Sequence, residues 1–125
     1  LQAISPDYIR MRNPVDIWPA AVTTGVEPAY REGLDIVLQD PNIDAVVPIL
    51  MLTADTGYPS LSFIVELARR HPDKPVYVTF SGDKPLCERA AGELEKHGVP
   101  TWPLIEEPFE VLSILAPRNR FHKPL

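Results

Sequence analysis

The sequence predicts an α/β fold: a three-layer sandwich in which a parallel sheet lies between two layers of helices. Apolar runs of strand length alternate with segments whose apolar residues recur at helical spacing. Short linkers join these segments, which is typical of right-handed βαβ units. Prolines number 15 in 125 residues, well above the average share of about 5%, and most of them stand at segment borders. The length suits one domain.

The first predicted helix begins near Glu27-Pro28, because proline is tolerated in a helix's first turn. It ends at Asp40-Pro41-Asn42, where proline cannot continue the helix. Between these limits one apolar stripe is formed by Tyr30, Leu34, Val37 and Leu38.

A strand, a loop and a second helix follow. The apolar run Ala45–Leu52 predicts a strand buried on both faces, with Pro48 marking a bulge or a sheet edge. Turn residues occupy 53–59. Ser60 is the predicted N-cap of the helix, whose apolar side is Leu61, Ile64, Val65 and Ala68.

The next strand is the clearest one, Pro75–Phe80, and residues 81–83 are predicted to turn from it into a third helix. Gly98 stands where a glycine commonly ends a helix. The inner face of this helix is predicted to be Cys87, Ala90, Ala91 and Leu94.

The chain is predicted to end with a short strand, Val99–Trp102, and a helix over Pro108–Leu115 that groups Phe109, Leu112 and Leu115. We expect the polar residues 117–125 to form a frayed tail. The predicted domain is therefore 1–116.

The composition excludes several classes of partner. The net charge of −5 argues against a nucleic-acid surface, since phosphates require clustered Lys and Arg. The longest apolar run, Ala45–Leu52, is far shorter than the roughly 18 residues of a membrane span. A single cysteine forms no internal disulfide. We find no leader pattern and expect a cytoplasmic protein.

The titratable residues favour structural roles. His71 and His97 stand at predicted helix ends, where a cationic imidazole interacts favourably with the helix dipole, and His122 lies in the tail. No His-x₃-His or His–Cys pair occurs, so we expect no metal site. Cys87 falls on an apolar stripe, where cysteine acts as a small hydrophobe. We assign no catalytic residue to this chain.

Loops that follow strands are the candidate binding sites, because ligands of open α/β sheets bind beyond the strands' carboxyl ends, at helix N-termini. The candidates are loops 16–25, 53–60 and 81–84. Their hydroxyls could bond a phosphate or carboxylate, or could merely cap helices; they belong to Thr53, Thr56, Ser60 and Ser81.

The Asn-Pro pair before Val15 forces extended backbone at Asn13. It predicts that Asp16 stands at a strand end, with a turn or a helix cap as the alternative.

Four motifs occur in a recognisable order along the chain, from about residue 1 to residue 115. They are Asn13-Pro14-Val15-Asp16, Asp40-Pro41-Asn42-Ile43-Asp44-Ala45-Val46, Lys74-Pro75-Val76 and His97-Gly98-Val99-Pro100. In this order they resemble the ligase-CoA domain of ADP-forming (NDP-forming) acyl-CoA synthetases, relatives of succinyl-CoA synthetase. A similar domain occurs in synthetase-like protein lysine acetyltransferases.

The resemblance implies a flavodoxin-like fold and a reaction. Acyl-CoA, ADP and phosphate give acid, CoA and ATP through a phosphohistidine, which helix N-termini from two domains stabilise. That histidine belongs to another domain, and none of the three histidines here matches it. The phosphate or acyl-site residues that carry over are Asn13 and Asp16 and, by position in loop 53–60, Thr53, Thr56 and Ser60.

The chain departs from the family at two turns. The glycine-rich turns of succinyl-CoA synthetases are replaced by Trp18-Pro19-Ala20-Ala21 and Thr53-Ala54-Asp55-Thr56. The family's first strand and helix would precede Leu1, so we expect the sheet to lack them. Our hypothesis is that residues 1–26 are displaced, pair differently, or complete the sheet of another copy.

The resemblance implies a fragment of an NDP-forming acyl-CoA synthetase that is inactive alone. The fragment would bind no cofactor itself, whereas CoA, ADP or ATP, and Mg²⁺ would serve the full enzyme. Its expected partners are the CoA-binding, phosphohistidine and nucleotide-grasp domains, with self-association through an open sheet edge. The alternatives are a non-catalytic regulatory or interaction domain of an acetyltransferase fusion, and a free-standing binder of a phosphorylated ligand.

Overall fold

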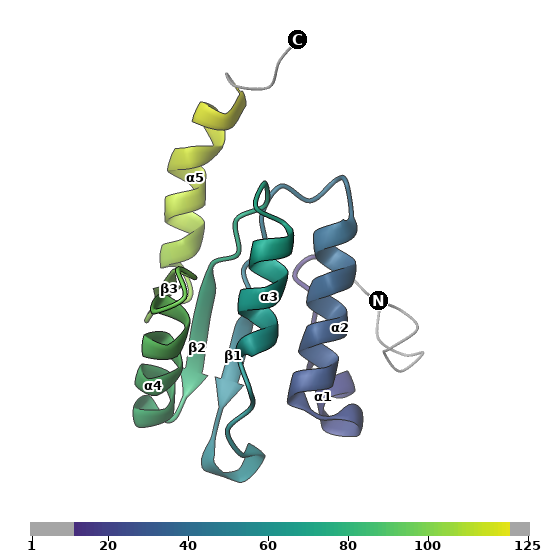
Figure 1. Cartoon of the computed structure of the whole chain (residues 1–125), viewed down its shortest axis with the longest axis vertical. Coiled ribbons are helices and arrows are strands. Elements are labelled where there is room, and N and C mark those ends of the chain that lie inside the picture. Colours follow the sequence, from purple (N-terminus) through teal and green to yellow (C-terminus); the bar gives the residue numbers. More distant parts are fainter. Residues whose placement is uncertain (1–11, 121–125) are drawn as a thin grey trace.

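Three parallel strands in the order β1-β2-β3 form one sheet with helices on both sides (Figure 1). This computed structural model describes residues 12–120, with side chains for residues 12–116. It confirms the predicted α/β class and is consistent with a flavodoxin-like fragment. The elements are α1 (Trp18–Thr24), α2 (Val26–Gln39), β1 (Ile49–Leu52), α3 (Ser62–Arg70), β2 (Val78–Gly82), α4 (Lys84–Glu95), β3 (Thr101–Trp102) and α5 (Glu107–Arg120).

The strands are shorter than predicted at their amino ends. Before β1 and β2 the chain makes one isolated parallel bridge, between Val46 and Val76. Pro48 supplies no N–H, but its carbonyl accepts the N–H of Thr79 at 3.1 Å. β1 is an edge strand of the described sheet, which is one of the two roles predicted from Pro48. β2 continues through Gly82, so part of the predicted 81–83 turn is strand.

The core lies on one face of the sheet, where the apolar sides of α2, α3 and α4 pack. Leu50 and Leu52 of β1 and Val78 of β2 are fully buried there. The predicted stripes are confirmed, because their central residues are buried in the same cluster, which includes Leu34, Leu38, Ile64, Val65, Ala90 and Leu94.

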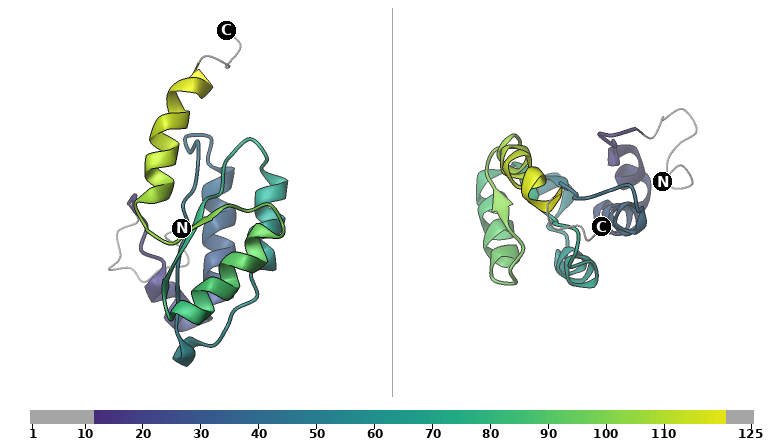
Figure 2. Two further views of the ribbon diagram at one scale, coloured as in Figure 1. Left: turned by 90° about the vertical axis from the view of Figure 1, so that its left-hand side faces the viewer. Right: turned by 90° about the horizontal axis from the view of Figure 1, so that it is seen from above.

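The prediction that the first strand is buried on both faces is wrong. Ile49 and Met51 point to the face opposite the core and are 37% and 39% exposed. Figure 2 shows α3 and α5 on opposite sides of the sheet, but α5 makes its contacts chiefly with β3. The outer face of β1 is therefore only partly covered.

Helix α2 lies beside β1, on the side away from β2 (Figures 1 and 2). Carbonyls of Pro48 and Leu52 accept N–H groups from the β2 side, so the carbonyl of Ile49 points outward by the alternation of a parallel ladder. The hydroxyl of Tyr30 donates to that carbonyl at 2.7 Å. One acceptor of the open edge is thus satisfied by a side chain of α2.

Helix α1 stands where the sequence predicted a loop over 16–25. Pro19 lies in its first turn, where its missing N–H costs nothing, and Ala20 and Ala21 are buried against α2. Residues 14–17 before it form no strand, so the predicted strand end at Asp16 is wrong. The hypothesis that residues 1–26 are displaced or pair differently also concerns residues 1–11, which lie outside the described part of the chain.

Helix α5 is longer than predicted and reaches Arg120, so residues 117–120 are helical and not a frayed tail. A glycine after the last turn commonly ends a helix, but the sequence has no glycine beyond Gly98. Residues 121–125 lie outside the described part. Phe109 is 50% exposed, which places the first residue of the predicted apolar group largely in solvent.

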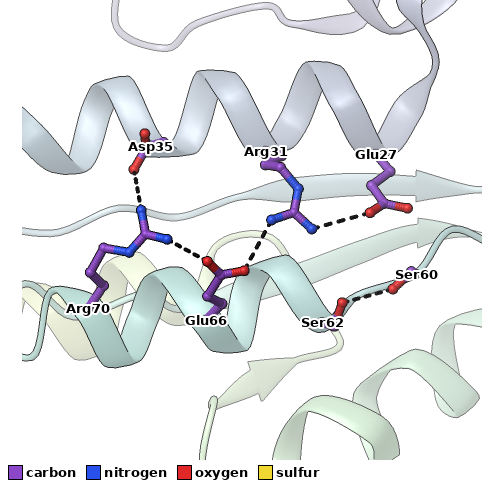
Figure 3. Close-up of polar contacts among 7 residues, drawn as sticks. All are labelled: Glu27, Arg31, Asp35, Ser60, Ser62, Glu66 and Arg70. Atoms are coloured by element: carbon purple, nitrogen blue, oxygen red, sulfur yellow. Dashed lines mark hydrogen bonds and ion pairs between the residues drawn. The ribbon is translucent and has the colours of Figure 1, made fainter.

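A row of charged side chains joins α2 to α3 on the surface (Figure 3). Arg31 bonds Glu27 at 3.3 Å within α2 and Glu66 of α3 at 3.1 Å. Arg70 of α3 bonds Glu66 and reaches back to Asp35 of α2 at 3.4 Å. These alternating charges fix the two helices side by side over the core.

Candidate functional site

The carboxyl ends of β1 and β2 lie side by side and open into one cavity. Leu52 pairs with Gly82 at the end of the ladder, and the chains leaving the two strands form the walls. The cavity has a volume of about 440 Å³ and is lined by Thr53, Ala54, Gly57, Tyr58, Asp83, Lys84, Pro85 and Leu86.

The close approach of the two strand ends depends on glycine. Gly82 has φ +119, and a Cβ there would stand 2.1 Å from the carbonyl oxygen of Leu52. Only glycine adopts this conformation freely and leaves that space. Two loops are thereby brought together that are separated by about thirty residues of chain.

Of the predicted site residues, Thr53 lines this cavity, whereas Thr56 lies beside Thr53 and outside the lining. The two hydroxyl oxygens lie 3.3 Å apart. The Thr56 hydroxyl also donates to the Thr53 carbonyl at 3.0 Å. Thr53 precedes a short 3₁₀ turn, Ala54–Thr56, at the strand end, and Thr56 ends it.

Ser60 lies away from this cavity and does not cap the following helix. The N-cap residue of α3 is Leu61, and the Ser60 hydroxyl pairs with that of Ser62 at 3.0 Å (Figure 3). The N-cap therefore lies one residue later than predicted, at Leu61, whose side chain is buried. Ser60 instead borders a second groove.

Asn13 and Asp16 are exposed and do not line the cavity. The carboxylate of Asp16 accepts the N–H of Trp18 at 3.0 Å, so it serves the start of α1. The N-cap of α1 is Ile17 and no side chain caps the helix, so the contact of Asp16 is a local turn, the other alternative predicted for it. The peptide bond between Asn13 and Pro14 is cis. Ser81, another candidate, lies in β2 and is exposed on the face opposite the core.

Tyr58 and Asp83 are site residues that sequence reasoning did not single out. Tyr58 separates the cavity from a groove of about 490 Å³ between α3 and α4. Its hydroxyl donates to Glu93 at 2.9 Å, and the guanidinium of Arg89 lies 4.0 Å from its ring centre. The sequence feature that could have identified Tyr58 is that it is an aromatic residue within a polar turn.

The environment of Tyr58 keeps its hydroxyl protonated. Burial, followed by the hydrogen bond to Glu93, raises the pKa of Tyr58 from 10.0 to about 12. The phenol is therefore a hydrogen-bond donor at neutral pH and holds the end of the loop on α4.

The side chains that line the cavity offer hydroxyl groups and one charge of each sign, from Asp83 and Lys84. Its lining includes no histidine and no cysteine. Cys87 lies one turn into α4 and is half-buried, and burial raises the pKa of its thiol, which disfavours the nucleophilic thiolate. The hydroxyls of the 3₁₀ turn and the start of α4 can hold and orient a ligand.

The described residues contain neither a metal-binding cluster nor a membrane-spanning helix. Within residues 12–120, no three His, Cys, Asp or Glu side chains are grouped so that they could hold a metal ion. In the same residues no helix has the length and apolar character needed to cross a bilayer.

One comparison with known proteins finds a relative. The chain is similar to acetate–CoA ligase (ADP-forming) II of Archaeoglobus fulgidus, with 25% identity over 119 residues. The match covers 90% of this chain but 16% of the ligase, so the chain spans about a sixth of that relative's length. This similarity supports a relation to the ADP-forming acetate–CoA ligases.

The other comparisons find nothing. No protein-family profile matches the chain, and no solved structure matches it.

Proposed function

We propose that this chain is one domain of an ADP-forming acyl-CoA synthetase and is inactive by itself. The observation that carries the proposal is the similarity to the archaeal ligase along nearly the whole chain. A parallel sheet flanked by helices on both sides is consistent with the ligase-CoA domain that the motifs resemble. Transfer chemistry would belong to other domains, since the cavity lining offers neither histidine nor cysteine.

Within that enzyme, the cavity beside Thr53 would face the phosphate or acyl group. Two features support this placement. The hydroxyls of Thr53 and Thr56 lie together at the carboxyl edge of the sheet, and α4 begins beside them with its N-terminal dipole. The positive helix end favours an anion, and the Thr53 hydroxyl, which lines the cavity, would fix its orientation.

The cofactors of the full enzyme belong to other domains in this proposal. CoA, the nucleotide and Mg²⁺ would be held by the partner domains, as the resemblance to the synthetase family implies. The cavity's own two charged side chains, Asp83 and Lys84, have opposite sign. A neighbouring domain would likewise supply the phosphohistidine.

The placement can be tested on the ¹⁵N-labelled chain by titration with inorganic phosphate and with acetyl phosphate at constant ionic strength. We expect amide shifts at Ala54, Thr56 and Leu86, and none at Ser62 in the neighbouring groove. A Thr53→Val, Thr56→Val double variant should weaken the shifts at least severalfold, because it removes the hydroxyl that lines the cavity and the neighbouring hydroxyl that contacts it. Shifts that are absent, or equal at both places, would overturn the placement.

The claim that the chain is inactive alone has a separate test. Acetyl-CoA, ADP and phosphate are incubated with the isolated chain, and ATP is measured. We expect none, and measurable ATP would refute the claim. The gene on both sides of this chain should encode a phosphohistidine segment and a nucleotide-grasp domain. An acetyltransferase module beside it would favour the regulatory-domain alternative instead.

A further inference from the structure

Asp83 occupies the N-cap position of α4 but does not cap the helix. Aspartate is among the preferred N-cap residues because its side chain accepts N–H groups of the first turn. Here its backbone has the extended conformation usual for an N-cap, φ −69 and ψ 117, yet the side chain makes no capping bond. The carboxylate instead accepts the N–H of Ala54 at 2.9 Å.

The sheet itself places Asp83 within reach of that N–H. The backbone N–H of Asp83 donates to the carbonyl of Leu52 at 2.8 Å, which continues the ladder one step beyond the strand ends. Gly82 allows this approach, as its missing Cβ leaves room for the Leu52 oxygen. Asp83 therefore stands opposite the first residues of the loop that follows β1.

The bond from Asp83 to Ala54 positions the whole 3₁₀ turn. Ala54 opens the turn, whose backbone is closed by the N–H of Thr56 donating to the Thr53 carbonyl at 3.2 Å. The two threonine hydroxyls are bonded within the same turn. At the far end, Tyr58 is anchored to Glu93 of α4. The turn is thus fixed to α4 at both ends, and the Asp83 bond is the anchor at the cavity.

We propose that Asp83 is the positioning residue of this site. Its carboxylate is used to hold the Thr53–Thr56 turn in place and not to cap α4, so that the first turn of α4 keeps N–H groups that the Asp83 side chain does not occupy. This inference rests on the proposed function only for the identity of the ligand. The positioning itself is a property of the free chain.

The test compares three variants of the full chain by amide hydrogen exchange. Asp83→Ser retains a good N-cap residue, but its short side chain does not reach Ala54. Asp83→Asn keeps a side-chain oxygen at the same distance. Ala54→Pro removes the N–H from the other side of the bond. Proline suits that position, because Thr53 is extended, with φ −130 and ψ 156, and Ala54 is a first helical residue.

In Asp83→Ser we expect the Thr56 and Ala54 amides to exchange at least tenfold faster, while exchange at Leu50 and Phe80 and the melting temperature stay near those of the parent. Asp83→Asn should keep the parent exchange rates. Ala54→Pro should accelerate Thr56 as Asp83→Ser does, and the two changes combined should add nothing further, as expected when both remove one interaction.

Other results would overturn the proposal. If exchange at Thr56 is unchanged in Asp83→Ser, the carboxylate does not hold the turn. If Leu50, Phe80 and Thr56 all accelerate equally, Asp83 supports only global stability. Failure of phosphate to shift the parent's amides, with the exchange pattern as expected, would count against the proposed ligand alone and leave the positioning role standing.

Discussion

Two tyrosine hydroxyls connect helices to other parts of the chain. Tyr30 of α2 donates to the Ile49 carbonyl, and Tyr58 donates to Glu93. Burial, and then the negative charge of Asp16, raises the pKa of Tyr30 to about 12. The pKa of Tyr58 is raised to the same region. Both residues must stay protonated to make these contacts.

This predicts a loss of stability in alkali. A group whose pKa is raised by folding stabilises the folded state fully below its unfolded pKa, here 10.0, and that contribution disappears as pH rises toward about 12. We expect the free energy of unfolding to fall through this window. In a Tyr30→Phe, Tyr58→Phe variant the fall should be shallower. Urea unfolding followed by tryptophan fluorescence measures both, and identical slopes would contradict the assignment.

Individual site residues were predictable only in part. Thr53 and Thr56 were identified because hydroxyl residues that follow a strand stand at the carboxyl edge of a sheet. The prediction for Ser60 was wrong: α3 begins at Ser62, and its N-cap is the buried Leu61. The sequence placed Asp83 only within a predicted turn. Its bond to Ala54 could not be predicted, because that bond depends on the alignment of two strands.

At the scale of elements, α2 and α3 are joined by the charged row in which Glu66 contacts both Arg31 and Arg70 (Figure 3). These side chains are roughly half exposed. Ion pairs of this kind contribute about 0.2–1 kcal/mol each and weaken in salt. The row therefore adds only a small, salt-dependent contribution to the stability of the fold.

We expect Glu66→Gln to lower the free energy of unfolding by about 0.5–1 kcal/mol at low ionic strength, with most of the loss abolished at about 1 M salt. Glu32→Gln is the matched control. Glu32 is an exposed glutamate of α2 that forms no ion pair within the described residues. Its effect should stay within about 0.5 kcal/mol. Chemical denaturation at two salt concentrations distinguishes the variants, and a loss that does not depend on salt would contradict the electrostatic explanation.

At the scale of the molecule, no strand of the described residues pairs with the outer edge of β1. β1 carries no charged residue between Pro48 and Leu52 to discourage pairing. Tyr30 satisfies the outward carbonyl of Ile49, whereas by ladder alternation Met51 presents its N–H and carbonyl outward. Met51 also exposes its side chain. We propose that this edge supports self-association of the chain.

Light scattering across a range of concentrations tests the edge. The average mass of the parent chain should rise with concentration. Met51→Lys should hold it at the monomer value, because a lysine on an edge strand opposes pairing. Val22→Lys is the control, since Val22 is an exposed apolar residue of α1, far from β1 in sequence, and it should behave as the parent does. A parent that stays monomeric throughout would contradict self-association.

Local patterns in the chain determined the α/β class, the apolar stripes of α2, α3 and α4, and the position of the loops that form the cavity. These follow from the periodicity of apolar residues and from prolines at element borders, which act over a few residues. Tertiary structure alone decided that β1 has one buried face, that α1 replaces a loop, and that Asp83 turns from its own helix to Ala54. The first and third depend on which segments distant in the chain lie side by side, and α1 depends on its packing against the neighbouring helix α2; spacing along one segment carries no such information.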